Sequence, residues 1–233
     1  MRSPGRLVLW DIDLTLVELR GLGGGWYAQA LADVAGVALR EVPTFPGRTE
    51  RAITMEVLAA HAIEATDEIV QRMWERLVAL STEARPTLAQ RGRALPGAAA
   101  ALDAMAGQAC IVQTLVTGNL PEIAMHKLSA FELHTHLDFD IGGYGSLSAQ
   151  RPELVAHAMR RAEAKHGNPY APESVVVIGD TPHDVDAALH HGAVAIGVAT
   201  GRHSERELRD SGAHVVFTDL SDTAAVLAAV LGR

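Results

Sequence analysis

The sequence contains little cysteine, few aromatic residues and almost no lysine. Cys110 is the only cysteine among 233 residues, which excludes an internal disulfide and fits a reducing cytoplasm. The chain has two lysines, Lys127 and Lys165, and a net charge of -8, so it lacks the basic clusters that neutralise nucleic-acid phosphates. We therefore expect no nucleic-acid partner.

Long apolar runs are also missing. The first run, residues 7–10, ends at two aspartates and is too short for a signal peptide or a membrane-spanning helix. With 48% apolar and 21% charged residues, the composition is that of a globular protein with a sizeable core. We expect a cytoplasmic protein without a membrane partner, either a monomer or a homodimer.

Five short apolar runs rich in β-branched residues predict strands that are buried on both faces. They are residues 7–10, 111–116, 175–178, 194–198 and 215–217. Residues 152–166 and 185–191 have helical spacing, and Gly192 ends the second of these helices. The alternation predicts an α/β fold with a doubly wound parallel sheet covered by helices on both faces.

The interval between residues 16 and 95 interrupts this alternation. It is too long for one crossover and contains no convincing strand, and its spacing predicts helices at about 26–37, 49–61 and 66–83. Thr49 and Thr66 are candidate N-caps. The glycine-rich run 21–25 lacks the Gly-Lys-Ser/Thr ending of a P-loop, so we interpret it and residues 85–97 as linkers. We predict an all-α cap domain at residues 17–93, inserted into a core formed by residues 1–16 and 94–233.

Two aspartates, Asp11 and Asp13, directly follow the first predicted strand. An extended backbone directs both side chains to one side at the carboxyl end of the strand, where open α/β sheets bind ligands. Carboxylates this close repel each other unless a cation relieves them, and Mg²⁺ takes oxygen ligands between carboxylates and a substrate phosphate. Alternatively, Asp13 or Thr15 only caps the next helix.

Two more predicted strands end in polar motifs. Residues 115–121 contain Thr117, Gly118 and Asn119 just before a proline that opens a helix, so a phosphate could bind there, although Asn119 could also be an ordinary N-cap. Residues 177–184 place Asp180 and Asp184 near the same edge. Agreement among three separate strand ends favours one active site over three unrelated turns.

With these motifs the chain resembles the haloacid dehalogenase superfamily, and specifically its phosphoglycolate-phosphatase-like branch with an α-helical cap after the first strand. The resemblance implies a Rossmann-like core and a Mg²⁺-dependent phosphatase that hydrolyses a small phosphorylated metabolite, such as a phosphoglycolate-like, sugar or organic-acid phosphate. Asp11 would attack phosphorus to form an aspartyl-phosphate, and Asp13 would protonate the leaving oxygen and later activate water.

The resemblance also implies which residues hold the phosphoryl oxygens. They are Thr117, Gly118, Asn119 and Arg151. The basic residue in this family is often a lysine followed by proline, whereas here Arg151 precedes the proline. Arginine can hold two oxygens through its fork, so the substitution keeps the function. Lys127 is the rival cation, and we interpret it as a surface residue.

The implied Mg²⁺ site consists of Asp11, the main-chain carbonyl of Asp13, and Asp180. Asp184 is expected to be an auxiliary acidic residue. Dehalogenases of this superfamily lack the second aspartate, so Asp13 favours a phosphate ester. Relatives that cleave carbon–phosphorus bonds use a cap lysine, and the predicted cap contains none.

Two alternative functions remain open at this stage. A sugar-phosphate mutase of the phosphoglucomutase type would need an acid/base group from the cap, and His61 and the many arginines of the cap are candidates. A non-catalytic binding or regulatory protein of the same fold would be expected to lack Asp11 or Asp180, and both are present.

Arg48 is the best candidate for substrate selection by the cap. It lies in residues 45–50, which resemble the Gly-Arg-Thr segment of phosphoglycolate-phosphatase-like caps. Arg48 could pair with a substrate carboxylate or a second phosphate. It could equally be a surface arginine beside the N-cap Thr49.

Overall fold

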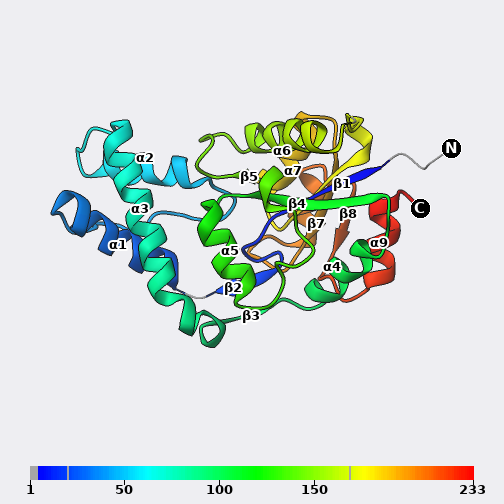
Figure 1. Cartoon of the computed structure of the whole chain (residues 1–233), viewed down its shortest axis with the longest axis horizontal. Helices are drawn as coiled ribbons and strands as arrows, with labels where there is room; N and C mark the ends of the chain where they lie inside the picture. Colours follow the sequence, from blue (N-terminus) through cyan, green and yellow to red (C-terminus); the bar gives the residue numbers. More distant parts are fainter. Residues whose placement is uncertain (1–4, 20, 168) are drawn as a thin grey trace.

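A parallel sheet of six strands forms the centre of the larger part of the molecule (Figure 1). The computed structural model describes residues 5–19, 21–167 and 169–233. The sheet has the order β5-β4-β1-β6-β7-β8, and each adjacent pair is parallel. Its strands are β1 (Arg6–Trp10), β4 (Ile111–Thr117), β5 (Gly143–Tyr144), β6 (Val175–Gly179), β7 (Val194–Val198) and β8 (Val215–Phe217).

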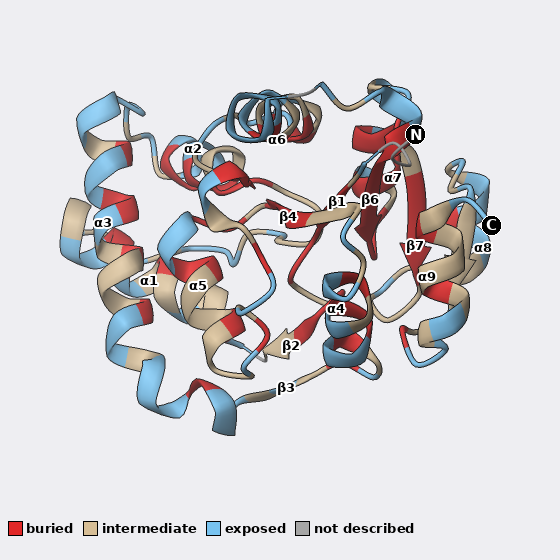
Figure 2. Cartoon of the chain, turned by 45° about the vertical axis from the view of Figure 1, so that its right-hand side comes forward, coloured by how far each residue is buried: buried red, intermediate tan, exposed pale blue. Residues whose placement is uncertain are grey.

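Helices cover both faces of this sheet, because side chains alternate between the two faces along each strand. Leu7 and Leu9 pack on one side and Val8 and Trp10 on the other. The first face carries α6 (Arg151–His166), α7 (Pro182–His190) and α8 (Glu205–Asp210), and the second carries α4 (Ala98–Ala106), α5 (Pro121–Ser129) and α9 (Thr223–Leu231). The buried residues lie along the strands and the inner sides of these helices (Figure 2). The predicted doubly wound sheet is confirmed.

Three helices form a second body at one end of the core (Figure 1). They are α1 (Leu22–Ala35), α2 (Glu50–Ala60) and α3 (Asp67–Ala84). The predicted N-caps are confirmed, since Thr49 Oγ1 accepts a hydrogen bond from the Ala52 N–H at 3.2 Å and Thr66 Oγ1 accepts one from the Ile69 N–H at 3.3 Å. The helices share their own hydrophobic core, which continues onto the first residues of α5.

The linker interpretation of the glycine-rich run is wrong for residues 22–25, which form the first turn of α1. Here the missing β-carbons serve packing. A β-carbon on Gly23 would lie 3.1 Å from the Phe45 ring, and one on Gly24 would lie 2.9 Å from Val42. The run lets the loop that precedes α2 pack against α1.

The expectation that residues 16–95 contain no strand is also wrong. The short strands β2 (Val17–Leu19) and β3 (Gly92–Ala94) pair antiparallel where the chain enters and leaves the cap. β2 reads Val-Glu-Leu and β3 reads Gly-Arg-Ala, so neither is a continuous apolar run of the kind that revealed the equally short β8. The predicted cap boundaries, residues 17 and 93, fall on this ribbon.

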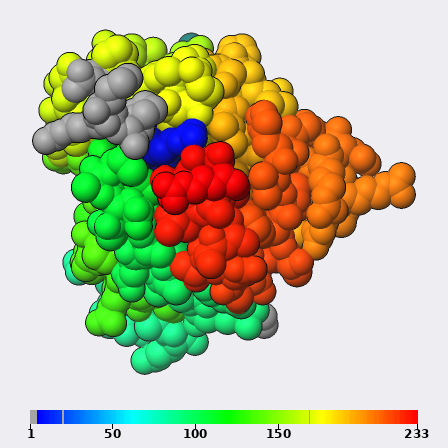
Figure 3. All heavy atoms as spheres, turned by 90° about the vertical axis from the view of Figure 1, so that its right-hand side faces the viewer, coloured from blue at the N-terminus to red at the C-terminus, as the bar shows by residue number. Residues whose placement is uncertain are grey.

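Three short 3₁₀ helices complete the described elements: η1 (Arg85–Gln90), η2 (Phe139–Ile141) and η3 (Pro172–Ser174). Figure 3 shows the side of the core away from the cap, where the C-terminal residues lie beside the N-terminal ones. Arg6 joins them by donating a hydrogen bond to the carbonyl of Leu231 at 3.0 Å. None of the helices in the described ranges combines the length and apolar character needed to cross a membrane.

Candidate active site

The candidate site begins where β1 ends. Asp11 continues the sheet pairing through its N–H, which donates to the Ile178 carbonyl at 2.9 Å, and the chain then turns sharply. The turn places Leu14 at φ 61°, a left-handed conformation that is uncommon for residues other than glycine. The Leu14 N–H closes the turn on the Val17 carbonyl at 2.8 Å. The turn holds Asp11 and Asp13 at the carboxyl edge of the sheet.

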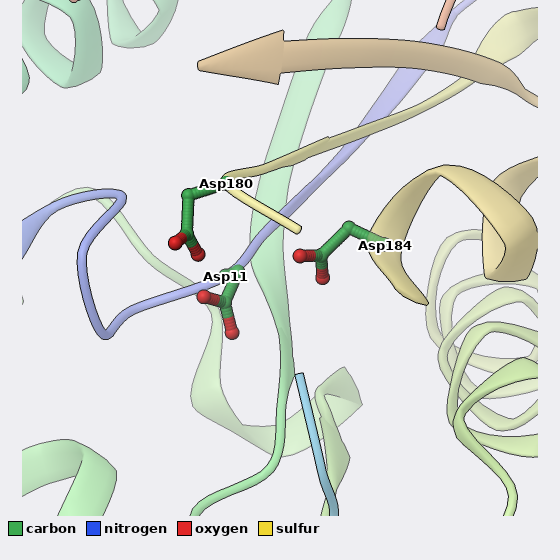
Figure 4. A group of neighbouring side chains, drawn as sticks. All are labelled: Asp11, Asp180 and Asp184. Carbon is green, nitrogen blue, oxygen red and sulfur yellow. The ribbon is translucent and has the colours of Figure 1, made fainter. Parts of the chain in front are cut away.

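Three aspartates from different elements converge at this edge (Figure 4). Asp11 follows β1, Asp180 follows β6, and Asp184 lies in the first turn of α7. One oxygen from each lies within 4.8 Å of the other two, and all three side chains are buried. The structure thus brings together three acidic residues that the sequence analysis singled out.

Arg151 is the cation at the centre of this group. It is the first residue of α6, and its side chain is only 5% exposed. Its Nη2 atom lies 2.7 Å from Asp11 Oδ1 and 2.6 Å from Asp184 Oδ1. Burial opposes the charge of Arg151, but Asp184 and Asp11 more than offset this and raise its pKa. Arg151 therefore stays charged beside Asp11.

Asp184 holds the arginine in place. Its Oδ2 atom accepts hydrogen bonds from the Thr181 N–H at 3.1 Å and the Thr181 hydroxyl at 2.7 Å, so Asp184 forms a capping box with Thr181, the N-cap of α7. Its Oδ1 atom faces Arg151. Asp184 is thus fixed by its own helix and fixes Arg151 in turn.

Ionisation is unfavourable for two of these carboxyl groups, those of Asp11 and Asp180. Burial raises the pKa of Asp11 to about 7, against the lowering effect of Arg151 and with further raising by Asp184 and Asp13. Burial together with Asp11 and Asp184 raises the pKa of Asp180 to about 9. A bound cation would relieve this repulsion.

The donor set fits a metal ion. Asp180 Oδ2 is buried and has no hydrogen-bond partner among the residues that the structure describes. A β-carbon on Gly201 would lie 1.8 Å from this oxygen, so only glycine leaves room for it. A buried carboxylate oxygen without a donor is costly on its own, and it is the ligand that hard divalent cations prefer.

The motif at the end of β4 is also directed at this edge. The Thr117 hydroxyl oxygen accepts hydrogen bonds from Asn119 Nδ2 at 2.8 Å and from the Asn119 N–H at 3.3 Å. Asn119 Nδ2 also donates to Asp13 Oδ2 at 2.8 Å. Gly118 packs directly against the cap, since a β-carbon at this position would lie 2.0 Å from the Arg48 carbonyl oxygen.

The interpretation of Lys127 as a surface residue is wrong. Its Nζ atom lies 2.7 and 2.6 Å from the two carboxylate oxygens of Asp13 and 2.7 Å from Asn119 Oδ1, and its side chain is 11% exposed. Lys127 follows Ile123 and Ala124, both buried, by one turn of α5, so it shares their face of the helix. Its long aliphatic chain then carries the ammonium group to Asp13.

Arg48 lines the site, but its guanidinium group is engaged within the cap. It forms an ion pair with Glu56 at 2.6 Å and donates to the carbonyls of Thr44 at 3.4 Å and Ala52 at 3.5 Å. Its contact with a substrate therefore stays a prediction and would require it to exchange these partners.

A cavity of about 1000 Å³ lies between the cap and the core. Asp11, Asp13, Asn119, Lys127, Arg151 and Asp180 line it from the core, and the cap contributes residues of α1, α2, α3 and the loop that precedes α2. The volume is that of a small-molecule site. Both bodies thus contribute to the wall of the cavity.

Sequence reasoning missed one cap residue of this cavity, Glu50. Its backbone N–H donates to the Gly118 carbonyl at 2.8 Å, which ties the start of α2 to the core. Its side chain is buried, and burial raises its pKa to about 7. A glutamate directly after an N-cap is common for reasons of the helix dipole alone, so the sequence carried no distinct signal.

The model of the haloacid dehalogenase-like hydrolase family matches residues 8–189. A hydrolase from Pseudomonas syringae is 22% identical, with a TM-score of 0.66 over 96% of this chain and 97% of its own. A predicted phosphoglycolate phosphatase from Haemophilus somnus is 19% identical, with a TM-score of 0.66 over 97% and 100% of the two chains. A HAD hydrolase of family IA, variant 3, from Entamoeba histolytica is 19% identical, with a TM-score of 0.69 over 98% and 100%. No curated protein matches the chain. At these identities the solved structures show a common fold.

Proposed function

Since this chain belongs to the haloacid dehalogenase-like hydrolase family, we propose that it is a Mg²⁺-dependent phosphatase that hydrolyses a small phosphomonoester. One observation carries the proposal. Asp11 is buried at the carboxyl edge of the sheet and lines the cavity, with the guanidinium group of Arg151 at 2.7 Å from one of its oxygens. A carboxylate beside a fixed cation is suited to attack a phosphoryl group whose charge that cation offsets.

The reaction divides into two steps. An Asp11 oxygen attacks phosphorus, the bond between phosphorus and the ester oxygen breaks, and Asp13 gives a proton to the departing alcohol. Asp13 then takes a proton from a water molecule, the water oxygen attacks phosphorus, and the bond to Asp11 breaks to release phosphate. Arg151, the Thr117 hydroxyl and the backbone N–H of Gly118 would hold the phosphoryl oxygens, and the backbone N–H of Asn119 would join them by exchanging its bond to Thr117.

Mg²⁺ would be held by Asp11, Asp180 and the main-chain carbonyl of Asp13. When bound, it would offset the negative charge of the phosphoryl oxygens and of the carboxylates. Asp184 would act through Arg151, because one of its oxygens already caps α7 and the other faces the guanidinium group. The unpartnered oxygen of Asp180 supports this assignment.

Lys127 and Asn119 would position Asp13. Both carboxylate oxygens of Asp13 lie within hydrogen-bond distance of Lys127, and Asn119 donates to one of them at 2.8 Å. A proton donor must be held near the leaving oxygen to be effective. Lys127 thus supports the acid, and Arg151 supports the nucleophile.

The phosphoglucomutase-like alternative loses its support from His61. The Nδ1 atom of His61 lies 2.7 Å from the Val57 carbonyl oxygen, and its Nε2 atom accepts a hydrogen bond from the Arg40 N–H at 3.0 Å. Both ring nitrogens are engaged within the cap, and His61 does not line the cavity. We therefore place the protein among phosphatases that act on small cytoplasmic metabolites.

Hydrolysis of p-nitrophenyl phosphate and of a panel of phosphorylated metabolites, with Mg²⁺ and with chelator, tests this function. We expect activity that requires Mg²⁺ and that falls by at least about 1000-fold in Asp11→Asn, because the nucleophile is lost. Full activity in chelator, or in Asp11→Asn, would exclude the proposed mechanism.

A further inference from the structure

The cap places a buried carboxyl group, that of Glu50, on its side of the cavity. Glu50 is the first residue of α2, and the hydrogen bond from its N–H to the Gly118 carbonyl fixes its position relative to the core. Its side chain lines the same cavity as Asp11, Asp13 and Lys127. The mechanism proposed above uses no acidic group from the cap, so Glu50 is free for another role.

A chain of hydrogen bonds determines how Glu50 is used. The Trp74 indole N–H donates to Thr54 Oγ1 at 3.0 Å, and Thr54 Oγ1 lies 2.9 Å from the Tyr27 hydroxyl, which donates to Glu50 Oε1. An indole N–H can only donate. Since the Tyr27 proton goes to Glu50, the Thr54 proton must go to Tyr27, and every bond of the chain has one direction.

This chain ends at Glu50 as an acceptor. Its Oε1 atom receives the Tyr27 proton, which orients the carboxylate. Its Oε2 atom has no hydrogen-bond partner within the described ranges, and it is not among the atoms that are fully shielded from solvent. Oε2 therefore offers the cavity a fixed acceptor that requires a donor from the ligand.

The buried and partly buried cations on the cavity wall already have acidic partners, and of these Lys127 also partly offsets the charge of Glu50. Arg48 is paired with Glu56, Lys127 with Asp13, and Arg151 with Asp11 and Asp184. Of the described cations that line the cavity, Arg202 has no ion pair, and it is exposed. A carboxylate or second phosphate on the substrate would meet a negative Glu50 without a free buried cation nearby.

The rest of the cap wall is largely apolar. Leu22, Phe45, Ile53 and Leu77 line the cavity from α1, α2, α3 and the loop that precedes α2. Such a wall can bury the carbon chain of an alcohol. The cap therefore combines an apolar surface with one oriented acceptor.

Building on the proposed phosphatase function, we propose that Glu50 selects the leaving group, and that the preferred substrate is a phosphomonoester whose alcohol carries a hydrogen-bond donor away from the phosphate, rather than a carboxylate or a second phosphate. Glu50 lines the same cavity as Lys127 and Asp13, whose charges act on its pKa in opposite directions. Burial raises this pKa to about 7, so the ionised acceptor dominates at about pH 8.

The test compares alkyl phosphates of three and of six carbons that end in a methyl, hydroxyl, ammonium or carboxylate group, at about pH 8. Two lengths are used so that one of them reaches Glu50. The variants are Glu50→Gln, which keeps the shape and an acceptor for Tyr27, and Tyr27→Phe, which removes the donor that orients Glu50. Glu68→Gln is the matched control, because Glu68 is exposed on α3 and does not line the cavity.

For the unmodified protein we expect kcat/KM to be higher for a donor-ended ester than for the methyl-ended ester, and lowest for the carboxylate-ended ester. Glu50→Gln should lower kcat/KM about ten- to hundredfold for the preferred donor-ended ester, which is the effect of losing a hydrogen bond to a charged group. Tyr27→Phe should have a smaller effect in the same direction. The methyl-ended ester should change less than about threefold, which also shows that the variant is folded. The hydroxyl and ammonium esters show which donor is used.

The inference is overturned if the carboxylate-ended ester is preferred, or if Glu50→Gln affects all four endings equally. A carboxylate preference that Arg202→Ala abolishes would assign selection to the exposed Arg202 instead of Glu50. In either case the methyl-ended ester is still hydrolysed. Failure of the phosphatase function itself looks different, because then neither the alkyl esters nor p-nitrophenyl phosphate would be hydrolysed.

Discussion

The ammonium group of Lys127 lies 2.6 and 2.7 Å from the two carboxylate oxygens of Asp13. The two residues come from α5 and from the turn after β1, and Asn119 completes the group by accepting from Lys127 at 2.7 Å and donating to Asp13 at 2.8 Å. The chain has only one other lysine, Lys165. A cation held this closely fixes the orientation of the Asp13 carboxyl group, which is the proposed general acid.

We predict that Lys127→Met lowers kcat/KM for alkyl phosphates by about 10- to 100-fold, because Asp13 is then less well placed to protonate the leaving oxygen. For p-nitrophenyl phosphate the loss should be under about threefold, since p-nitrophenolate leaves without a proton and kcat/KM reports only the steps up to bond cleavage. Steady-state kinetics on both esters measure the difference.

Lys165→Met is the control for this prediction. Lys165 is 43% exposed and pairs with Asp138 and Asp140 outside the cavity, so its removal should leave both values of kcat/KM unchanged. An equal loss on the two esters in Lys127→Met would show that the lysine does not act through proton transfer.

Gly118 provides a test of cap docking. A β-carbon at this position would lie 2.0 Å from the Arg48 carbonyl oxygen, which is backbone and cannot move alone. Gly118→Ala should therefore displace the start of α2 and lower kcat/KM on alkyl phosphates by about 100-fold, the usual effect of a misplacement of about 1 Å. Kinetics and thermal unfolding are measured together, and the unfolding temperature should change little by comparison.

The matched substitution is Gly107→Ala at the C-terminus of α4. Gly107 has φ -67°, and the nearest atom to an added β-carbon is at 3.5 Å, an ordinary contact. It should leave activity unchanged. If Gly118→Ala retained full activity as well, the backbone contact between cap and core would have no part in catalysis.

The acidic cluster should make the stability of the metal-free protein depend on pH. The pKa values of Asp11 and Asp180 are raised to about 7 and about 9, whereas an unfolded aspartate titrates near about 4. Between these values the folded protein holds more protons than the unfolded chain. The contribution of these two carboxyl groups to the free energy of unfolding in chelator therefore decreases as the pH rises from about 4 through about 7 and, for Asp180, toward about 9.

Thermal unfolding at about pH 6 and about pH 8, each with chelator and with Mg²⁺, measures this dependence. We expect a lower Tm in chelator at the higher pH, and a larger increase on adding Mg²⁺ there, because the ion competes with protons for the carboxylates. Asp180→Asn should reduce both effects. Glu50, whose pKa is also raised, would add to the decrease of Tm with pH but not to the effect of Mg²⁺. A Tm in chelator that increases between these two pH values would refute the assignment.

Much of the core could be predicted from the sequence. Strands that are buried on both faces leave continuous apolar runs, and the strands that become β1, β4 and β6 each end in polar residues. Parallel strands place their carboxyl ends at one edge, so the approach of Asp11 to Asp180 and Thr117 follows from topology. The strands β2, β3 and β5 contain two or three residues each, and none of them is a continuous apolar run like the equally short β8, so they left no pattern in the sequence.

Two residues of the site could not be placed in this way, for different physical reasons. Lys127 did carry a signal, because Ile123 and Ala124 one turn before it are apolar and mark its face of α5 as buried. Glu50 carried none. Its role depends on Tyr27 and Thr54. Tyr27 lies 23 positions before Glu50 and 27 positions before Thr54, so it meets them only in the folded cap.

The central claim is that Asp11 becomes phosphorylated, and Asp13→Asn offers the most direct measurement. This variant cannot activate water, yet p-nitrophenolate still leaves without a proton, so the intermediate should accumulate. The protein is mixed with p-nitrophenyl phosphate and Mg²⁺, quenched in acid and analysed by peptide mass spectrometry. We expect about one phosphate on Asp11 per protein chain. The double variant Asp11→Asn with Asp13→Asn should carry none. Phosphate on another residue, or release of p-nitrophenolate by Asp13→Asn with Asp11 unmodified throughout the first turnover, would contradict the account.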